Sequence, residues 1–240
     1  MEDEAVVRLN SVTKSYRLGS VSVRALTDVS VEVRRGDFVA LAGPSGSGKT
    51  TLLNLIGCID KPDSGRVAIG GVDVTDSPLH RLAGLRLNTL GFIFQTFNLV
   101  PVLTAYENVE YPLLMKNVPR RERDERVRRW LAKVDIEAQA KQRPDQLSGG
   151  QRQRVAIARA MAGDPKLVLA DEPTANLDSE TAARILDLLV EINRATGCTF
   201  VFSTHDTSLI ARARRLLRIR DGRIVQHAPA GEVRQEEAFV

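Results

Sequence analysis

The sequence predicts an α/β fold in which a helical insert interrupts an alternating strand–helix scaffold, and three observations lead to this. The apolar runs Phe38–Ala42 and Leu167–Ala170 have the near-continuous hydrophobicity of strands that are buried on both faces. Helical spacing follows such strands at Thr51–Ile56 and between about Glu180 and Thr196. From Thr104 to about Ala162 the strand signals vanish, and charge-rich helical patterns replace them.

The first forty residues have the period-two alternation of half-buried strands. Val6–Leu9, Val21–Val23 and Val29–Val33 each alternate apolar and polar side chains, and a turn follows at residues 34–37. Pro112, Pro119 and Pro144 are predicted to punctuate the helices of the insert. Further strands are expected, in chain order, at Gly65–Val74, Gly91–Phe94, Thr199–Ser203, Leu216–Ile219 and Arg223–Val225.

Length and composition favour a folded protein without a membrane span of its own. A chain of 240 residues can bury a full core. The longest apolar stretches have about five residues, whereas a membrane-crossing helix needs roughly 20. The acidic start, Met1–Glu4, lacks the basic-then-apolar layout of a secretion signal. We therefore expect a cytosolic protein that associates with a membrane only through a partner.

The formal net charge of +4 does not predict a nucleic-acid partner, because basic and acidic residues are interspersed along most of the chain, as in Arg120–Arg126. The denser run Arg212–Arg223 could face anionic lipid, although solvated surface charge is the preferred interpretation. Cys58 and Cys198 lie in apolar surroundings without the spacing of a metal site. We expect both to be reduced thiols in the core.

A phosphate-binding loop is predicted at Gly43–Thr50, which matches G-x-x-x-x-G-K-[ST] between an expected strand and an expected helix. Its glycines let successive backbone N–H groups point at phosphate oxygens, and the helix N-terminus adds partial positive charge. Lys49 should span the β- and γ-phosphates, and the Thr50 hydroxyl should bind Mg²⁺. The expected ATP contacts here are Gly43, Pro44, Ser45, Gly46, Ser47, Gly48, Lys49, Thr50 and Thr51.

Two acidic residues end the strand that begins at Leu167. The strand fixes the position of Asp171, which can hold Mg²⁺ through water, and places Glu172 where it could polarise an attacking water molecule. Alone, such a pair is equally well explained as the start of a helix. The phosphate-binding loop upstream favours the catalytic interpretation.

The segment Leu147-Ser148-Gly149-Gly150-Gln151 resembles the signature of ATP-binding-cassette (ABC) ATPases, and motifs matching this family run from Tyr16 to His205. The resemblance implies a P-loop NTPase (RecA-like) core with an N-terminal antiparallel β subdomain and an inserted α-helical subdomain. It implies one nucleotide-binding domain over 1–240, with the core and β subdomain in 1–95 and 163–240. The helical subdomain would occupy about 96–162 and carry the signature.

The resemblance also assigns roles to individual residues. Tyr16 matches the aromatic residue that stacks on adenine, although a buried edge-strand tyrosine is an alternative. Ser148 and the two glycines match the signature that contacts the γ-phosphate held by an opposite subunit. Asp178 falls in the loop that crosses the dimer interface; Ala175 stands there where the family commonly has glycine, a change that we expect to be tolerated. The implied catalytic residues are Glu172, His205 and Gln95, and the implied Mg²⁺ ligands are Thr50, Gln95 and Asp171.

By the same resemblance, two copies would close head to tail around two ATP-Mg and reopen after hydrolysis. The stretches Gly91–Pro101, Leu103–Val109 and Ala170–Asp178 resemble the branch of lipoprotein-releasing, macrolide-export and cell-division ATPases (mechanotransmission, type VII). This branch implies an integral membrane permease that docks near Gln95–Tyr106, at the cytoplasmic face of the bacterial inner membrane. Phe97, Leu99 and Tyr106 are candidate groove residues, or else part of the core of the insert.

Two other functions remain open at this point. One is the ATPase of a conventional small-molecule exporter or importer. The other is a soluble ABC protein of DNA repair or translation, but those usually carry a long coiled-coil insert or two cassettes, for which this chain is too short. Extraction of lipoprotein or lipid, or export of a macrolide or peptide, is the expected task. The transported molecule should bind the permease and not this chain.

Overall fold

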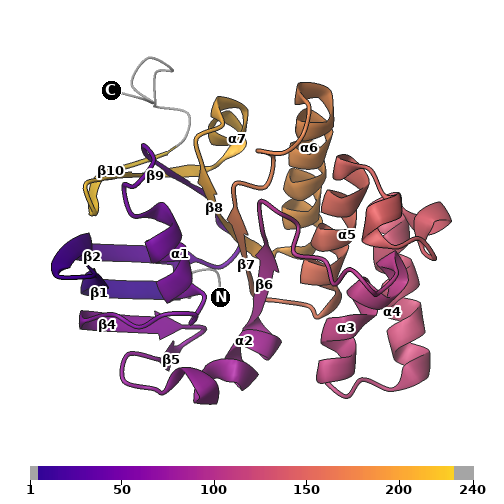
Figure 1. The fold of residues 1–240 in the computed structure, drawn as a ribbon, viewed down its shortest axis with the longest axis horizontal. Coiled ribbons are helices and arrows are strands. Elements are labelled where there is room, and N and C mark those ends of the chain that lie inside the picture. The colour runs from indigo at the N-terminus through magenta and orange to yellow at the C-terminus, as the bar shows by residue number, and fades with distance from the viewer. Residues whose placement is uncertain (1–4, 230–240) are drawn as a thin grey trace.

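The computed structural model describes residues 5–229, in which two β-sheets are flanked by helices. Residues 1–4, whose acidic character argued against a secretion signal, lie outside the described residues. The smaller sheet is antiparallel and has the strand order β2-β1-β4-β5 (Figure 1). Its strands are β1 (Ala5–Leu18), β2 (Val21–Arg34), β4 (Ser64–Ile69) and β5 (Val72–Asp73).

The β1–β2 hairpin is longer than the sequence predicted. Val21–Val23 and Val29–Val33, expected as two strands, are parts of the single 14-residue strand β2. The residues between them keep strand pairing through several register shifts, and Asp28 takes a positive φ of 52° at one of these irregularities. Such bulges break the period-two pattern, so the continuity of the strand was hidden in the sequence.

The larger sheet has six strands in the order β10-β9-β3-β8-β7-β6. All neighbouring strands are parallel except the pair formed by β9 and β10. The carboxyl ends of the parallel strands therefore meet at one edge of the sheet. The strands are β3 (Phe38–Ala42), β6 (Leu90–Ile93), β7 (Leu167–Asp171), β8 (Thr199–Thr204), β9 (Arg215–Arg220) and β10 (Arg223–Pro229).

The helices agree with the predicted pattern in the long elements and depart from it in the short ones. The sequence did not predict α2 and α7, which have only seven and six residues and so carry little periodicity. Pro112 was expected to punctuate helices, but it lies inside a helix, as the eighth residue of α3. The helices are α1 (Lys49–Ile56), α2 (Ala83–Thr89), α3 (Ala105–Met115), α4 (Arg120–Lys133), α5 (Gly149–Ala162), α6 (Ser179–Thr196) and α7 (Thr207–Arg212).

The core has two parts, one on each face of the larger sheet. Along β3, Phe38, Ala40 and Ala42 face a cluster that includes α3, α4, α5 and α6. Val39 and Leu41 face the other cluster, which includes α1 and the antiparallel sheet. Every residue of β3 is buried, as predicted for a strand that is covered on both sides.

Helices α3, α4 and α5 gather on one side of the molecule, opposite the antiparallel sheet (Figure 1). The structure thus confirms the predicted α/β core, antiparallel N-terminal sheet and helical insert. Whether residues 96–162 form a subdomain with those bounds stays a prediction. No helix between residues 5 and 229 is both long enough and apolar enough to cross a membrane.

The two cysteines are buried free thiols within the described chain, as predicted. Cys58 is 1% exposed and Cys198 is 5% exposed. Burial raises the pKa of Cys58 to about 11 and that of Cys198 to about 12. Both side chains therefore stay protonated at neutral pH, which suits a packing role.

Candidate functional site

A cleft of about 600 Å³ lies where the parallel strands of the larger sheet end. The loop after β3 forms one wall, Gln95 follows β6, and Asp171 and Glu172 end and follow β7. Ser203 and His205 come from the end of β8 and the loop beyond it. Strand ends of one parallel sheet therefore bring together residues that are up to about 160 positions apart in the chain.

The loop 43–48 adopts the tight path that its glycines predict. A Cβ atom on Gly43 would overlap the carbonyl oxygen of Ile219. One on Gly48 would lie 2.6 Å from the carbonyl oxygen of Ala25, and Gly48 also has a φ of 108°, which L residues rarely adopt. Glycine is therefore required at both positions, and the backbone is left open toward the cleft.

Lys49 is the first residue of α1, and its side chain turns back so that the ammonium group contacts the loop. It donates hydrogen bonds to the carbonyl oxygens of Gly43 at 2.7 Å and Pro44 at 2.9 Å. These contacts place a positive charge at the loop, beside the N-terminus of α1. A phosphate group fits this combination of a cation, a helix N-terminus and inward backbone N–H groups.

Ser47 is placed differently from the other predicted phosphate contacts. Its side chain is buried, it does not line the cleft, and its hydroxyl has no hydrogen-bond partner among residues 5–229. Its carbonyl oxygen accepts from the N–H of Gly222 at 3.0 Å, which anchors the loop to the β9–β10 turn. All other predicted loop contacts, from Gly43 through Thr51, line the cleft.

The three residues expected to hold Mg²⁺ all line the cleft. The Thr50 hydroxyl donates to the Asp171 carboxylate at 3.4 Å, and Gln95 lines the same cleft. Hydroxyl, carboxylate and amide oxygens are hard ligands of the kind that Mg²⁺ prefers, with waters completing its shell. The donor set present therefore fits this ion.

Glu172 and His205 form a hydrogen-bonded pair at the rim. The Nδ1 atom of His205 lies 2.8 Å from Oε1 of Glu172, whose side chain is 16% exposed while that of His205 is 66% exposed. Glu172 has a positive φ of 46°, and its N–H donates to the carbonyl oxygen of Ser203 at 2.9 Å. The sheet edge thus holds the backbone of Glu172 and leaves its carboxylate in the cleft.

Sequence reasoning missed Ser203 and Ala25, which also line the cleft. The Ser203 hydroxyl is buried without a hydrogen-bond partner in the described part of the chain. A polar residue near the carboxyl end of a fully buried strand was a usable signal for it. Ala25 lies in the middle of β2 and carries no such signal.

Tyr16 lies beyond the end of the cleft and does not line it. It is 36% exposed, so the alternative of a buried tyrosine is wrong. Its hydroxyl donates to the Asp60 carboxylate at 2.8 Å. Tyr16 pairs with Val23 of β2, and Ala25, two residues further along that strand, lines the cleft.

The signature residues are at the start of α5 and line no part of the cleft of their own chain, as far as residues 5–229 show. Ser148 is the exposed N-cap: its hydroxyl accepts from the N–H of Gln151 at 3.3 Å, and its own N–H donates to the Gln151 side chain at 2.8 Å. Leu147 is buried beneath this turn. Asp178 is the exposed N-cap of α6, and its carboxylate accepts a hydrogen bond from the N–H of Thr181 at 2.9 Å.

The loop after Gln95 is fastened to two neighbouring segments. The side chain of Asn176 donates to the carbonyl oxygen of Gln95 at 2.8 Å. Arg159, on α5, donates to the carbonyl oxygens of Phe97 at 2.8 Å and Asn98 at 2.6 Å. Phe97 and Asn98 both have positive φ values, so these bonds stabilise a strained turn.

The three apolar residues proposed for a docking groove belong to the core instead. Phe97 is 8% exposed and lies under the guanidinium of Arg152, whose carbon is 5.1 Å from the ring centroid. Leu99 and Tyr106 are half-buried against the helical core. Burial, together with the hydrogen bond to Asp124, raises the pKa of Tyr106 to about 12. The alternative interpretation, an ordinary insert core, is the correct one for these residues.

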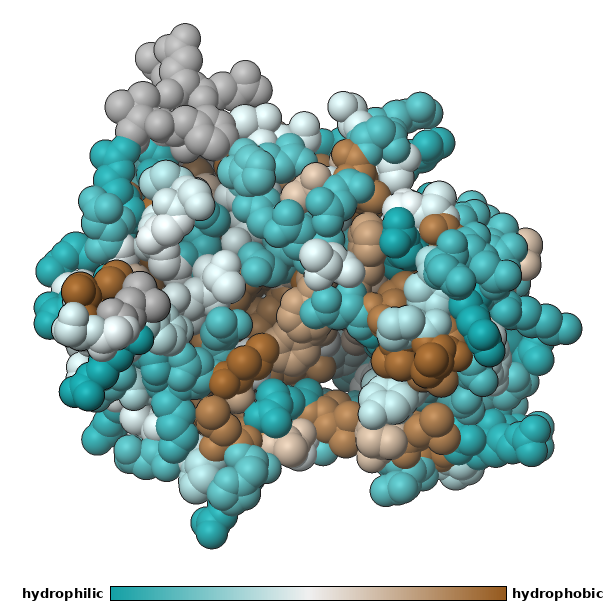
Figure 2. Space-filling model, in the orientation of Figure 1, coloured by the Kyte–Doolittle hydropathy of each residue, from teal (hydrophilic) through white to brown (hydrophobic). Residues whose placement is uncertain are grey.

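A groove of about 390 Å³ does exist nearby, but other side chains line it. It runs between α2 and β6 on one side and α3 and α5 on the other. Its walls include Phe92, Phe94, Val100, Tyr111 and Pro112. Figure 2 shows apolar surface on both sides of the hollow between β6 and α3.

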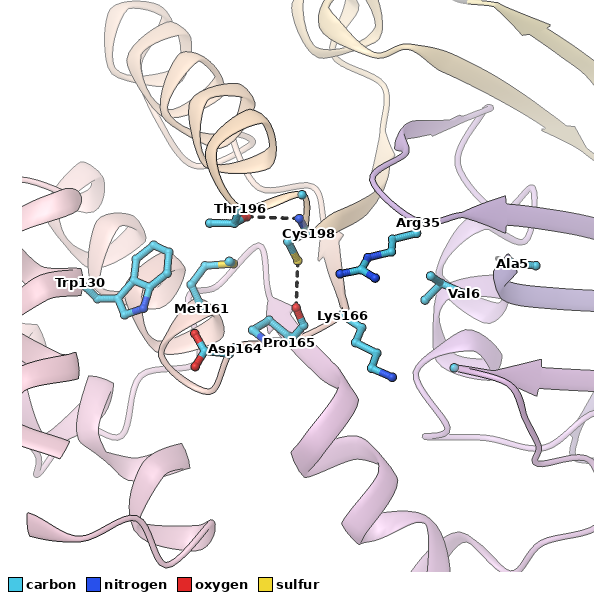
Figure 3. A pocket seen from close by; sticks show the side chains of 12 residues that line it. Ala5, Val6, Arg35, Trp130, Met161, Asp164, Pro165, Lys166, Thr196 and Cys198 are labelled. Carbon is cyan, nitrogen blue, oxygen red and sulfur yellow. Dashed lines mark hydrogen bonds between the residues drawn. The ribbon is translucent and has the colours of Figure 1, made fainter. Parts of the chain in front are cut away.

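A further cavity of about 280 Å³ lies at the opposite edge of the larger sheet, near the starts of β7 and β8 (Figure 3). Lys166 and Cys198 border it there, and Trp130 borders it from the helical side. The predicted ATP, catalytic and Mg²⁺ residues lie elsewhere. The cleft at the carboxyl ends of the strands is therefore the candidate site.

Comparisons with known proteins agree with this geometry. A relative described as an uncharacterized ABC transporter ATP-binding protein of Thermotoga maritima is 48% identical over 219 residues, which is 91% of this chain and 93% of that protein. The macrolide export ATP-binding/permease protein MacB of Hyphomonas neptunium is 45% identical over 233 residues, covering 97% of this chain. The match spans 36% of MacB, so the chain corresponds to about a third of that protein.

Solved structures give the same result. A dimer of the ATP-binding cassette MJ0796 from Methanocaldococcus jannaschii, in a post-hydrolysis state with ADP and Pi, superposes with a TM-score of 0.87 at 43% identity. The superposition covers 93% of this chain and 98% of that one. The sequence model of the family described as "ABC transporter" matches residues 26–175. With macrolide-export proteins of the predicted branch among its relatives, the chain belongs to the ABC transporter family, as an ATP-binding subunit or domain.

Proposed function

We propose that the chain hydrolyses ATP as a head-to-tail dimer and drives conformational change in a membrane permease. One observation carries this proposal: the chain holds both halves of a triphosphate site, but the halves are apart. The cleft holds a phosphate loop and a candidate base, while the exposed start of α5, with Ser148, lines no part of that cleft within residues 5–229. A second copy completes each site, and the dimers of the relative MJ0796 support this assembly.

In this proposal, the loop 43–48 and Lys49 bind the triphosphate. Backbone N–H groups of residues 43–48 and the ammonium of Lys49 contact phosphate oxygens, and Lys49 exchanges its two carbonyl contacts for them. Thr50, Asp171 and Gln95 hold Mg²⁺. When bound there, Mg²⁺ neutralises negative charge on the phosphate oxygens. The adenine base extends from the cleft toward Tyr16, whose pairing partner Val23 lies two residues from the cleft residue Ala25.

Hydrolysis depends on Glu172, which accepts a hydrogen bond from the attacking water and withdraws its proton. The bond to His205 fixes the direction of the carboxylate, and the exposed ring of His205 contacts the γ-phosphate in the proposed closed dimer. Ser148 and the glycine N–H groups of the second copy complete the cage. Loss of the γ-phosphate removes the contacts that join the copies, so the dimer opens.

The groove between β6 and α3 is the proposed docking site for the permease. Beside it, α3 exposes Tyr111 at 46%, Leu114 at 38% and Met115 at 50%, and Tyr111 also lines the groove. Neighbouring exposed apolar side chains of this kind suit a docking surface. The occupant would be a short apolar helix of a membrane subunit. In MacB, whose name describes an ATP-binding/permease protein, the similar region is joined to the rest of one chain, which supports such a partner.

With such a permease, the chain would act at the cytoplasmic face of the bacterial inner membrane and be held there by that partner. The proposed task is extraction of lipoprotein or lipid, or export of a macrolide or peptide, with no nucleic-acid partner. A conventional small-molecule transporter is the alternative. Purification from detergent-solubilised membranes tests this: a co-purifying permease supports the proposal, whereas co-purifying ribosomes or DNA would replace it with the soluble alternative.

The dimer is tested with Glu172→Gln. Glutamine keeps the size of the side chain and an oxygen that can accept a hydrogen bond from His205, but it cannot act as the general base. We expect hydrolysis to fall about 100- to 10,000-fold and light scattering to show a stable dimer in ATP-Mg. Adding Lys49→Ala to this variant should return it to a monomer. The proposal fails if Glu172→Gln stays monomeric in saturating ATP-Mg although it binds the nucleotide.

A further inference from the structure

The side chain of Tyr16 is held by two neighbours that the proposed reaction does not use. Its hydroxyl donates to Oδ2 of Asp60 at 2.8 Å. The ammonium of Lys14 lies over one face of the ring, 5.2 Å from its centroid. Lys14 and Asp60 are themselves joined at 2.8 Å, so the three side chains form a closed triangle.

This triangle is anchored to the backbone on both sides. Lys14 and Tyr16 are both on β1, and Lys14 is 9% exposed, which is unusually low for lysine. Its ammonium also donates to the carbonyl oxygen of Lys61 at 2.7 Å. Asp60 accepts from the N–H of Lys61 at 2.7 Å, and its own N–H donates to Asn54 of α1 at 3.3 Å. The helix that starts with the phosphate loop is thereby connected to the strand that carries Tyr16.

The charges of the triangle are consistent with this fixed arrangement. Burial raises the pKa of Asp60, but hydrogen bonds from Lys14, the Lys61 N–H and Tyr16 outweigh it and hold the pKa below its usual value. Burial and the bond to Asp60 raise the pKa of Tyr16. Asp60 therefore remains an acceptor and Tyr16 a donor across the neutral range.

The consequence is a ring with one occupied face and one open face. The ammonium covers one face, the hydroxyl is tethered, and Tyr16 is still 36% exposed. A planar base that stacks on a ring already held in place does not have to immobilise that side chain. Loss of such preorganisation corresponds to about a two- to tenfold loss of affinity.

We propose that Lys14 and Asp60 are positioning residues for the nucleotide base, because they hold the open face of Tyr16 toward adenine. The inference rests on the proposed function, in which the cleft binds ATP and Tyr16 receives the base. It adds a base-specific role for two residues that touch neither the phosphates nor the reacting atoms.

The test measures binding of ADP-Mg and pyrophosphate-Mg by calorimetry, because the ratio of their dissociation constants isolates the nucleoside. Tyr16→Ala should weaken ADP about tenfold or more, the loss expected for one stacked base. Tyr16→Phe, which keeps the ring and removes the tether, should weaken ADP about two- to tenfold. Lys14→Met should act in the same direction. All three variants should bind pyrophosphate like the unaltered protein.

Tyr106→Phe is the matched control, since it removes another tyrosine hydroxyl bonded to an aspartate at 2.8 Å but lies in the helical insert. It should leave both affinities unchanged. In the Tyr16→Ala background, Lys14→Met should have no further effect on ADP, because a positioning residue has nothing left to position.

The outcomes separate this inference from the proposed function. If the unaltered protein binds neither ligand, the proposed function fails. If it binds both, and Tyr16→Ala weakens ADP relative to pyrophosphate while Tyr16→Phe and Lys14→Met do not, the function stands and the positioning role is overturned. The role is also overturned if Lys14→Met weakens ADP equally in the presence and absence of Tyr16.

Discussion

Gly150 lies so close to α6 that a single methyl group would force two helices apart. A Cβ atom at Gly150 would lie 2.6 Å from Cγ2 of Thr181, in the first turn of α6. At the neighbouring Gly149 the nearest atom would be Cδ2 of Leu177, at an ordinary 3.5 Å. Gly150→Ala and Gly149→Ala therefore form a matched pair, with the same chemical change in the same turn and opposite steric outcomes.

The expected difference follows from these two distances. Carbon atoms pack best at about 3.5–4.0 Å, so the Gly150→Ala variant carries an overlap of roughly 1 Å, and overpacking of this kind costs about 1–3 kcal/mol. Alanine gains up to about 1 kcal/mol over glycine in a helix, and this gain applies to both variants. Gly150→Ala should therefore be less stable than Gly149→Ala by about 1–3 kcal/mol. For a chain of this length, each kcal/mol corresponds to about 2–4 °C in Tm.

Urea unfolding and thermal melts of the two variants measure this difference. Thr181→Ser supplies the rescue, because it removes Cγ2 and keeps the N–H that binds Asp178. The combination of Gly150→Ala with Thr181→Ser should recover most of the lost stability. Equal stability of the two alanine variants, or a double variant no more stable than Gly150→Ala alone, would refute the close approach of the two helices.

Three further predictions concern residues away from the reaction. Cys58 and Cys198 should not react with a disulfide reagent at pH 8 until the chain is unfolded, because both thiols are buried with raised pKa values; fast reaction of either in the native protein would contradict this. Asn108→Ala should lower the free energy of unfolding in urea by about 1–3 kcal/mol, since this fully buried amide accepts from the N–H of Val100 and donates to three carbonyl oxygens. Arg159→Met should increase amide hydrogen exchange over residues 96–100 and leave α5 protected, because it removes two bonds to that loop; unchanged exchange there would show that other contacts hold the loop.

The sequence was sufficient wherever one local pattern determines both structure and chemistry. The apolar run Phe38–Ala42 predicts a strand that is buried on both faces, and the glycine-rich turn after it predicts a phosphate loop. The carboxyl ends of parallel strands then bring Gln95, Asp171 and His205 into one cleft. These placements need no knowledge of which side chains meet, only of which strand each residue ends.

Prediction failed where a partner distant in the chain decides the outcome. Phe97 is apolar and adjacent to a motif, yet Arg152 covers it, and the hydroxyl of Tyr106 is bound by Asp124. The loop motif did not reveal that the side chain of Ser47 is buried, while its contact with phosphate through the backbone stays a prediction. Pro112 lies within α3 because the surrounding helix packs against α4 and α5, which outweighs its local preference.

The cleft and the start of α5 are two unlike surfaces of one chain, and their relative orientation decides how large an assembly can grow. A molecule with two unlike complementary patches can stack with its neighbours without end, as filaments do. If instead the two patches contact their counterparts across a twofold axis, both patches of each copy are buried in one dimer. No patch then remains free to bind a third copy. A filament and a closed dimer would thus use the same two surfaces. The relative orientation of these surfaces on one chain decides which of the two assemblies forms.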